Sequence, residues 1–190
     1  MNILFVNACI RKESRTKKLA EQVIEKIKTA EDTVSEVYVA DAVMPIKDES
    51  FILSRNNASS SKDFSNDIYA PAKQFADADL IVVGTPYWDL SFPAILKAYF
   101  EQINVLGLTF EYAADGTPRG LCKAQKLIYV TTAGGPIISD EYGYGYVKTM
   151  AQAFYGISDV KQIKAEGLDI FGADIDSILN DAIKNISSCL

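Results

Sequence analysis

The 190-residue sequence contains no histidine. Histidine is the usual general base at neutral pH and the commonest zinc ligand, so its absence excludes histidine-dependent serine and cysteine triads and most catalytic zinc sites. If the protein is an enzyme, we therefore expect a bound cofactor to supply the chemistry.

Cysteine and long apolar runs are scarce as well. Cys9, Cys122 and Cys189 are far apart and form no C-x-x-C pair, which predicts neither a disulfide framework nor a metal site. No apolar run approaches eighteen residues, and the sequence opens in a strand-like run without a charged leader. We expect a cytoplasmic protein in a reducing compartment, with no membrane association.

The chain has fewer basic than acidic residues. Nineteen Lys and Arg against 25 Asp and Glu give a net charge of −6, which disfavours nonspecific binding to nucleic acid. Neither the glycine-rich dinucleotide fingerprint nor the G-x-x-x-x-G-K-[ST] loop occurs, which argues against a classical NAD-binding turn and against an NTPase. A content of 48% hydrophobic and 23% charged residues predicts a globular chain, and its length suits one domain over residues 1–190.

Apolar runs typical of buried strands alternate with helical patterns along the chain. We predict strands over residues 2–8, 34–40, 80–84, 126–132 and 159–165. We predict helices over residues 14–30, 68–78, 93–105, 146–154 and 174–186. This alternation predicts an α/β fold, a flavodoxin-like three-layer sandwich whose five-stranded parallel sheet has the order 2-1-3-4-5.

Two segments interrupt the alternation. Residues 44–66 are polar and serine-rich, which predicts a mobile surface excursion; a lid or a partner contact is the alternative. Residues 110–119 predict a hairpin with Asp115 and Gly116 in its turn.

The loop after the first strand concentrates positive charge where a helix begins. Arg11, Lys12 and Arg15 lie there beside the hydroxyls of Ser14 and Thr16. A helix N-terminus offers unpaired N–H groups and a positive dipole end, so the loop could bind a phosphate monoester. The alternative is simple helix capping by Ser14.

Two further loops follow the third and fourth strands. The first spans 84–93 and carries Tyr87 and Trp88, which could flank a planar ligand or merely cover the sheet end or a subunit contact. The second carries Gly134 and Gly135, which permit either close backbone approach to a ligand or a tight turn. Because the carboxyl ends of adjacent parallel strands share one edge of the sheet, we expect all three loops to surround one crevice.

With these loops in view, the chain resembles the flavodoxin-like NAD(P)H-dependent oxidoreductases, the family of FMN-dependent azoreductases and NAD(P)H:quinone oxidoreductases. The resemblance rests on residues 7–16 (NACIRKESRT), 86–101 (PYWDLSFPAILKAYFE), 107–121 (GLTFEYAADGTPRGL), 131–135 (TTAGG) and 156–168 (GISDVKQIKAEGL).

The resemblance implies FMN as cofactor. Its phosphate is expected at Ser14, Arg15 and Thr16, with help from Arg11, and its ring at Pro86, Tyr87, Trp88, Asp89, Leu90, Thr132, Ala133, Gly134 and Gly135. Azoreductases often carry a serine six residues before Ser14, where this chain has Ala8, so one hydroxyl contact is lost. The histidine that assists catalysis in mammalian quinone reductases has no counterpart here.

The implied activity is hydride transfer from NADH or NADPH through the flavin to a quinone, azo compound or similar acceptor. A homodimer with the active site at its interface is also implied, with helix 93–105 contributing. A proton donor could be Tyr142, Tyr144, Tyr146 or water, but packing or subunit contact is the favoured interpretation of these tyrosines. Two rival hypotheses remain: a flavodoxin-type electron carrier without nicotinamide turnover, and a flavin-free binding or scaffold protein.

Overall fold

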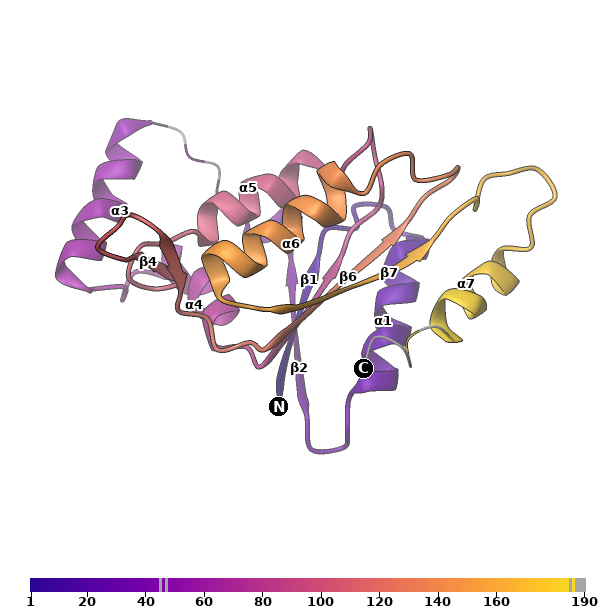
Figure 1. The fold of residues 1–190 in the computed structure, drawn as a ribbon, viewed down its shortest axis with the longest axis horizontal. Coiled ribbons are helices and arrows are strands. Elements are labelled where there is room, and N and C mark those ends of the chain that lie inside the picture. Colours follow the sequence, from indigo (N-terminus) through magenta and orange to yellow (C-terminus); the bar gives the residue numbers. More distant parts are fainter. Residues whose placement is uncertain (45, 47, 185, 187–190) are drawn as a thin grey trace.

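Five parallel strands form the central sheet. The computed structural model describes residues 1–44, 46, 48–184 and 186. The strands are β1 (Asn2–Asn7), β2 (Thr33–Tyr38), β3 (Leu80–Gly84), β6 (Lys126–Thr132) and β7 (Asp159–Ala165). They lie in the order β2-β1-β3-β6-β7, which confirms the predicted 2-1-3-4-5 arrangement (Figure 1).

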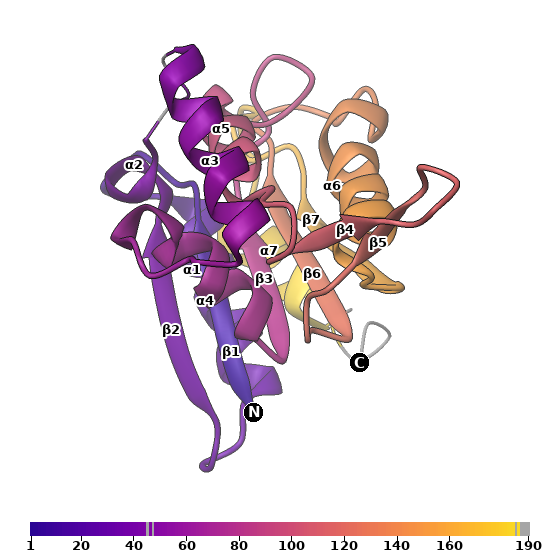
Figure 2. The same ribbon diagram turned by 90° about the vertical axis from the view of Figure 1, so that its left-hand side faces the viewer.

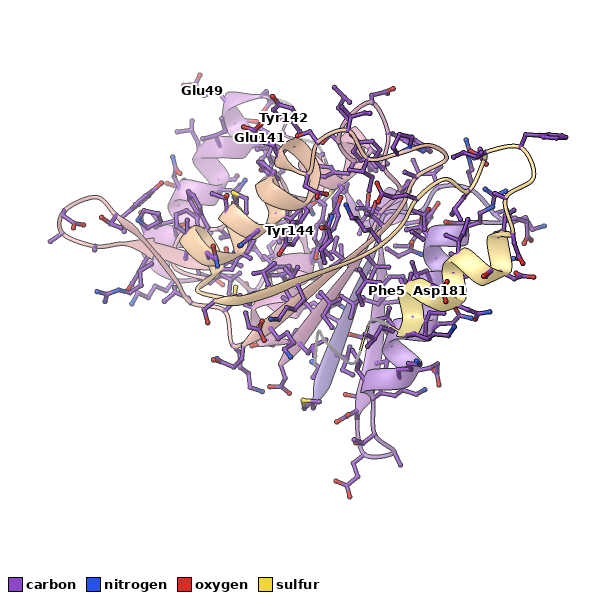
Figure 3. All side chains as sticks on the ribbon, turned by 45° about the vertical axis from the view of Figure 1, so that its right-hand side comes forward. Phe5, Glu49, Glu141, Tyr142, Tyr144 and Asp181 are labelled. Carbon is purple, nitrogen blue, oxygen red and sulfur yellow. The ribbon has the colours of Figure 1, made fainter. Side chains whose placement is uncertain are left out.

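Helices cover both faces of this sheet, as Figures 1 and 2 show. One face packs on α1 (Arg15–Ile27) and α7 (Ile175–Lys184). The other packs on α4 (Ala70–Asp77), α5 (Ala94–Ile103) and the helical segment around α6 (Tyr146–Met150). Alternate residues of β1 serve the two cores: Phe5 lies on the α7 side (Figure 3), whereas Leu4 lies on the α5 side. Because both faces of such a strand are buried, its sequence is a continuous apolar run.

Several element boundaries differ from the predictions. The second strand ends at Tyr38, because Val39 begins the short helix α2 (Val39–Ala42); its burial extends the apolar run beyond the strand. The predicted helix 146–154 begins earlier, with the π-helical turn η2 (Glu141–Gly145), and ends in a second such turn, η3 (Ala151–Tyr155). The short 3-10 helix η1 (Asp67–Tyr69) precedes α4, and the end of the predicted helix 174–186 falls partly outside the described residues.

The serine-rich segment contains a helix that the sequence analysis does not predict. Helix α3 (Glu49–Ser61) begins at Asp48, whose side chain accepts a hydrogen bond from Phe51 N, and none of its residues is buried. The sequence of α3 shows no helical periodicity, because its apolar side chains do not gather on one face. The surface position agrees with the prediction; Figure 2 shows α3 on the outside of the helical layer.

The predicted hairpin is confirmed. Strands β4 (Phe110–Tyr112) and β5 (Pro118–Gly120) pair antiparallel, and Asp115 and Gly116 lie in the turn between them. Gly116 has a φ of 83°, which glycine adopts without strain. Within the described part of the chain, no helix has both the length and the apolarity that crossing a bilayer requires.

Candidate functional site

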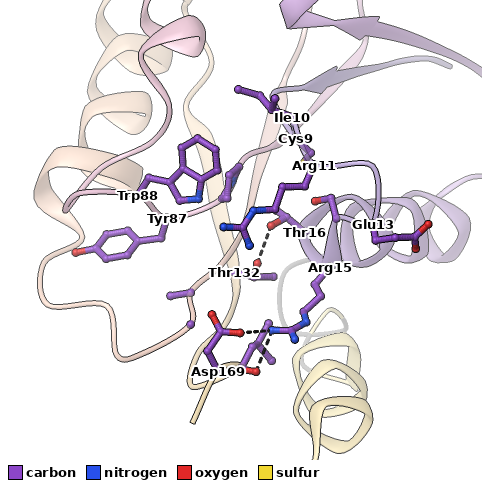
Figure 4. A pocket seen from close by; sticks show the side chains of 15 residues that line it. Cys9, Ile10, Arg11, Glu13, Arg15, Thr16, Tyr87, Trp88, Thr132 and Asp169 are labelled. Atoms are coloured by element: carbon purple, nitrogen blue, oxygen red, sulfur yellow. Dashed lines mark hydrogen bonds and ion pairs between the residues drawn. The ribbon is translucent and has the colours of Figure 1, made fainter.

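A cavity of about 300 Å³ lies at the carboxyl ends of β1, β3 and β6 (Figure 4). Three of its walls are the loops that follow these strands, and a fourth is the loop between β7 and α7. The strand order changes direction at β1, and ligands of open α/β sheets bind at such a point. The three predicted loops therefore meet around one hollow.

Most of the predicted cofactor-binding residues line this cavity. They are Arg11, Ser14, Arg15, Thr16, Pro86, Tyr87, Trp88, Thr132, Ala133 and Gly134. Asp89, Leu90 and Gly135 do not line it, and Asp89 instead lines a neighbouring apolar hollow next to the start of α5. A role for these three in cofactor binding stays a prediction.

Ser14 caps helix α1 and so leaves the helix end open toward the cavity. Its Oγ accepts a hydrogen bond of 3.1 Å from Lys17 N, so the capping interpretation of Ser14 is correct. Capping does not exclude ligand binding, because the N–H groups of Arg15 and Thr16 belong to the first helical turn and have no acceptor within the helix. The Thr16 and Thr132 hydroxyls are 2.6 Å apart, which joins this helix end to the end of β6.

The loop after β3 is a tight and rigid turn. Trp88 N donates to Ser91 O at 3.0 Å and Ser91 N donates to Trp88 O at 2.8 Å, enclosing a two-residue turn. Asp89 and Leu90 both have positive φ, 50° and 70°, as a type I′ turn requires, although neither is glycine. This turn places Trp88 at the cavity wall, where the Arg11 guanidinium lies 5.9 Å from the centre of the indole ring.

Sequence reasoning missed five lining residues: Cys9, Ile10, Glu13, Leu168 and Asp169. The most consequential is Asp169, in the loop between β7 and α7. Its N–H donates to Gly134 O at 2.9 Å, and Leu168 N donates to Ala133 O at 3.2 Å. The resemblance over residues 156–168 covers the strand β7 and the first three residues of its loop, and stops one residue before Asp169.

The backbone at Gly134 lies close to the Asp169 side chain of this loop. A Cβ on Gly134 would lie 2.3 Å from Asp169 Oδ2, whereas a Cβ on Gly135 would meet nothing within 4 Å. The group closest to Gly134 is thus the protein's own carboxylate, and an approach of these glycines to a ligand stays a prediction.

The charged groups of the cavity are largely paired. Arg15 Nη1 donates to Asp169 Oδ1 at 2.7 Å, and Lys18 pairs with Glu13 at 3.2 Å. Arg11 has no ion pair among the residues that the structure describes. Burial raises the pKa of the Cys9 thiol to about 11, so this thiol is protonated at neutral pH and does not act as a nucleophile.

The three candidate proton donors lie outside the cavity. Tyr144 Oη donates to Val160 O at 2.9 Å, and the Tyr146 ring packs 5.6 Å from Phe92. Tyr142 is exposed, and Figure 3 shows it with Tyr144 on the opposite side of the sheet from α7. These contacts support a packing role for Tyr144 and Tyr146.

Comparison with known proteins agrees with this geometry. The profile of the flavodoxin-like fold family matches residues 1–190. An FMN-dependent NADH:quinone oxidoreductase of Coprothermobacter proteolyticus is 38% identical over 96% of this chain and 94% of its own length. A second protein of that name, from Clostridium acetobutylicum, is 34% identical over 96% of this chain and 94% of its own.

Solved structures show the same fold. The crystal structure of an azoreductase from Bacillus anthracis has a TM-score of 0.82 and 25% identity, and the match covers 99% of this chain and 97% of that one. An FMN-dependent NADH-azoreductase from the same species, in complex with FMN, has a TM-score of 0.79 at 22% identity over 98% and 96% of the two chains. The chain therefore belongs to the flavodoxin-like fold family and, within it, to the family of these FMN-dependent NADH:quinone oxidoreductases.

Proposed function

We propose that the protein is an FMN-dependent oxidoreductase that uses NADH to reduce a quinone or an azo compound. The observation that carries the proposal is that three loops far apart in sequence surround one cavity. The cavity offers helix N–H groups and the Arg11 guanidinium, as a phosphate requires, together with the indole of Trp88, as a flat ring requires. We also propose that residues 1–190 act as one FMN-binding domain.

The residues present fit FMN. The N–H groups of Arg15 and Thr16 and the guanidinium of Arg11 would hold the phosphate, and Trp88 and Tyr87 would flank the ring. When bound, FMN supplies the redox chemistry: it accepts hydride from a nicotinamide and passes electrons to the acceptor. The chain's own groups fix the orientation of the ring and surround it with backbone dipoles at Ala133 and Gly134.

The proposed phosphate site lacks one hydroxyl that azoreductases often have. Ala8 is buried and its N–H donates to Gly84 O at 2.9 Å, so position 8 contributes no side-chain donor. Phosphate binding then depends more on the helix end and on Arg11.

The names of the relatives support NADH as the electron donor and quinones as acceptors, and azo compounds enter through the azoreductase structures. These names also favour an enzyme over the two rivals, the electron carrier and the flavin-free scaffold. A carrier would bind FMN without oxidising NADH, and a scaffold would not bind FMN.

Absorption spectroscopy tests all three functions. The protein is incubated with FMN and freed from excess, and NADH or NADPH is added without oxygen, followed by menadione. We expect a flavin band near about 450 nm that NADH bleaches and menadione restores, since bound flavin is reduced and reoxidised. A stable band that NADH leaves unchanged would indicate a carrier, and no band at all would indicate a scaffold.

We further propose a homodimer in which α5 contributes to an interface next to the cavity. The family resemblance supports it, as does the exposed apolar side chain of Ile10, which lines both the cavity and the apolar hollow next to the start of α5. Sedimentation equilibrium with and without FMN measures the mass, and a monomer under both conditions would refute the dimer. The cytoplasmic location stays a prediction, which cell fractionation tests.

A further inference from the structure

The side chain of Arg15, which lines the cavity, is turned toward the loop between β7 and α7. Its Nη1 donates to Asp169 Oδ1 at 2.7 Å and to Leu168 O at 2.9 Å, so one guanidinium nitrogen joins helix α1 to the loop between β7 and α7 (Figure 4). One of the two arginines that line the cavity is therefore already held by a carboxylate of the protein.

Asp169 is held in this place by its backbone. Asp169 N donates to Gly134 O and Gly167 N donates to Gly135 O, at 2.9 and 3.1 Å, which fixes this loop against the loop after β6. The carboxylate lies so close to Gly134 that a Cβ there would clash with it. These bonds fix the backbone of Asp169 beside the cavity, and the ion pair with Arg15 directs its carboxylate.

The charges that line the cavity cancel. Arg11 and Arg15 are cationic and Glu13 and Asp169 are anionic, so the lining itself carries no net charge for a phosphate dianion. Glu13 is directed to Lys18 instead, which leaves Asp169 as the carboxylate that competes for Arg15.

We propose that Asp169 holds Arg15 away from the coenzyme phosphate, and that Arg15 exchanges Asp169 for the phosphate when FMN binds. Asp169 then determines specificity: it lowers the affinity for phosphorylated flavin and leaves the affinity for unphosphorylated flavin unchanged. The inference rests on the proposed FMN function. On this proposal, Arg15 binds the phosphate only after it has released Asp169.

The exchange is physically feasible because the ion pair is partly solvated. The side chains of Arg15 and Asp169 are 39% and 66% exposed, and pairs in such positions contribute little to stability. A phosphate carries more negative charge than a carboxylate and offers three acceptor oxygens to the guanidinium, so it is the stronger partner.

Binding of FMN and of riboflavin, which lacks the phosphate, separates this effect from any contact with the ring. Dissociation constants are measured by quenching of flavin fluorescence for the wild-type chain, Asp169→Asn and Glu13→Gln. We expect Asp169→Asn to bind FMN about three- to tenfold more tightly and riboflavin as the wild type does. Glu13→Gln removes the same charge from the same cavity without releasing Arg15, so its gain for FMN should be about twofold or less.

A double-mutant cycle with Arg15→Gln tests the exchange itself. In the Arg15→Gln chain, we expect FMN to bind more weakly and the gain from Asp169→Asn to disappear. A full gain in that background would mean direct repulsion and would overturn the exchange. Weaker binding of both flavins to Asp169→Asn and to Asp169→Ser would make Asp169 a ligand of the ring or ribityl chain, which also overturns it.

The proposed function fails in a different way. If the wild-type chain binds neither FMN nor riboflavin, the coenzyme assignment falls and the inference falls with it. If both flavins bind and Asp169→Asn changes nothing, the FMN function stands and only the inference falls.

Discussion

The two sides of the cavity are built differently. One side, here called the strand-end wall, consists of the loops after β1, β3 and β6 with the start of α1, residues 8–16, 85–92 and 133–136. The bonds Thr85 N to Val130 O and Tyr87 N to Thr132 O, both 3.0 Å, continue the sheet into this wall. The other side is the β7–α7 loop, residues 166–174, in which Phe171 is fully exposed.

The difference shows which part of the site has a rigid geometry. The strand-end wall inherits its geometry from a buried sheet, and such sites hold their shape because the scaffold is rigid. The β7–α7 loop reaches the cavity through backbone bonds to residues 133–135 and through the Arg15 side chain. We therefore expect substitutions in the strand-end wall to have large effects on coenzyme binding, and substitutions beyond Asp169 to have small ones.

The largest effect is expected at Ser14. Asp is as good an N-cap as Ser, so Ser14→Asp should keep the helix while placing a carboxylate beside the phosphate. We expect FMN affinity to fall about 100-fold, or about 2.7 kcal/mol, and riboflavin affinity to change little. Fluorescence titration measures both.

The neutral variant Ser14→Asn is the matched control, because it caps the helix without adding charge. If Ser14→Asp and Ser14→Asn bind FMN as the wild type does, the phosphate does not lie at this helix end.

A smaller loss is expected at Trp88, which forms the aromatic part of the strand-end wall. Trp88→Ala should weaken the binding of FMN and of riboflavin alike, by about tenfold or about 1.4 kcal/mol, because the proposed site sets the indole against the ring and not the phosphate. Calorimetric titration with the two flavins checks this, with Trp88→Phe as a variant that keeps a ring. A loss confined to FMN would contradict a ring contact.

In the turn next to Trp88, one substitution should raise the stability of the fold. Leu90 adopts a φ of 70° with its side chain about half exposed, and this conformation costs a non-glycine residue roughly 1–2 kcal/mol. Leu90→Gly relieves that strain and adds freedom to the unfolded chain, so we expect a net gain of about 0.5–1 kcal/mol in the free energy of unfolding. Urea denaturation measures it, and Leu90→Ala, which keeps the strain, should give no gain.

The smallest effect is expected at Phe171, the exposed tip of the β7–α7 loop. Phe171→Ser should change the unfolding free energy by less than about 0.5 kcal/mol and leave FMN affinity unaltered, since the side chain contacts nothing that it could lose. Denaturation and flavin titration of one preparation test this. A large loss of affinity would make the loop tip part of the site and would remove the contrast between the two walls.

The sequence predicts the sheet and the strand-end wall for the same reason. Runs such as Leu80–Gly84 have a clear apolar pattern, and the order of the strands dictates which loops meet. Helix α3 escapes prediction because its apolar residues share no face and none of them is fully buried. Asp169 escapes because its role depends on a contact with Arg15 across 154 residues of chain, which no local pattern encodes.

The central claim is that the cavity at the ends of β1, β3 and β6 holds FMN, and a crystal structure of the protein with FMN tests it most directly. We predict electron density for the phosphate within hydrogen-bond distance of the Arg15 and Thr16 N–H groups and for the ring against Trp88. Density for FMN elsewhere on the protein, or a cavity that FMN does not enter when flavin is bound, would contradict it.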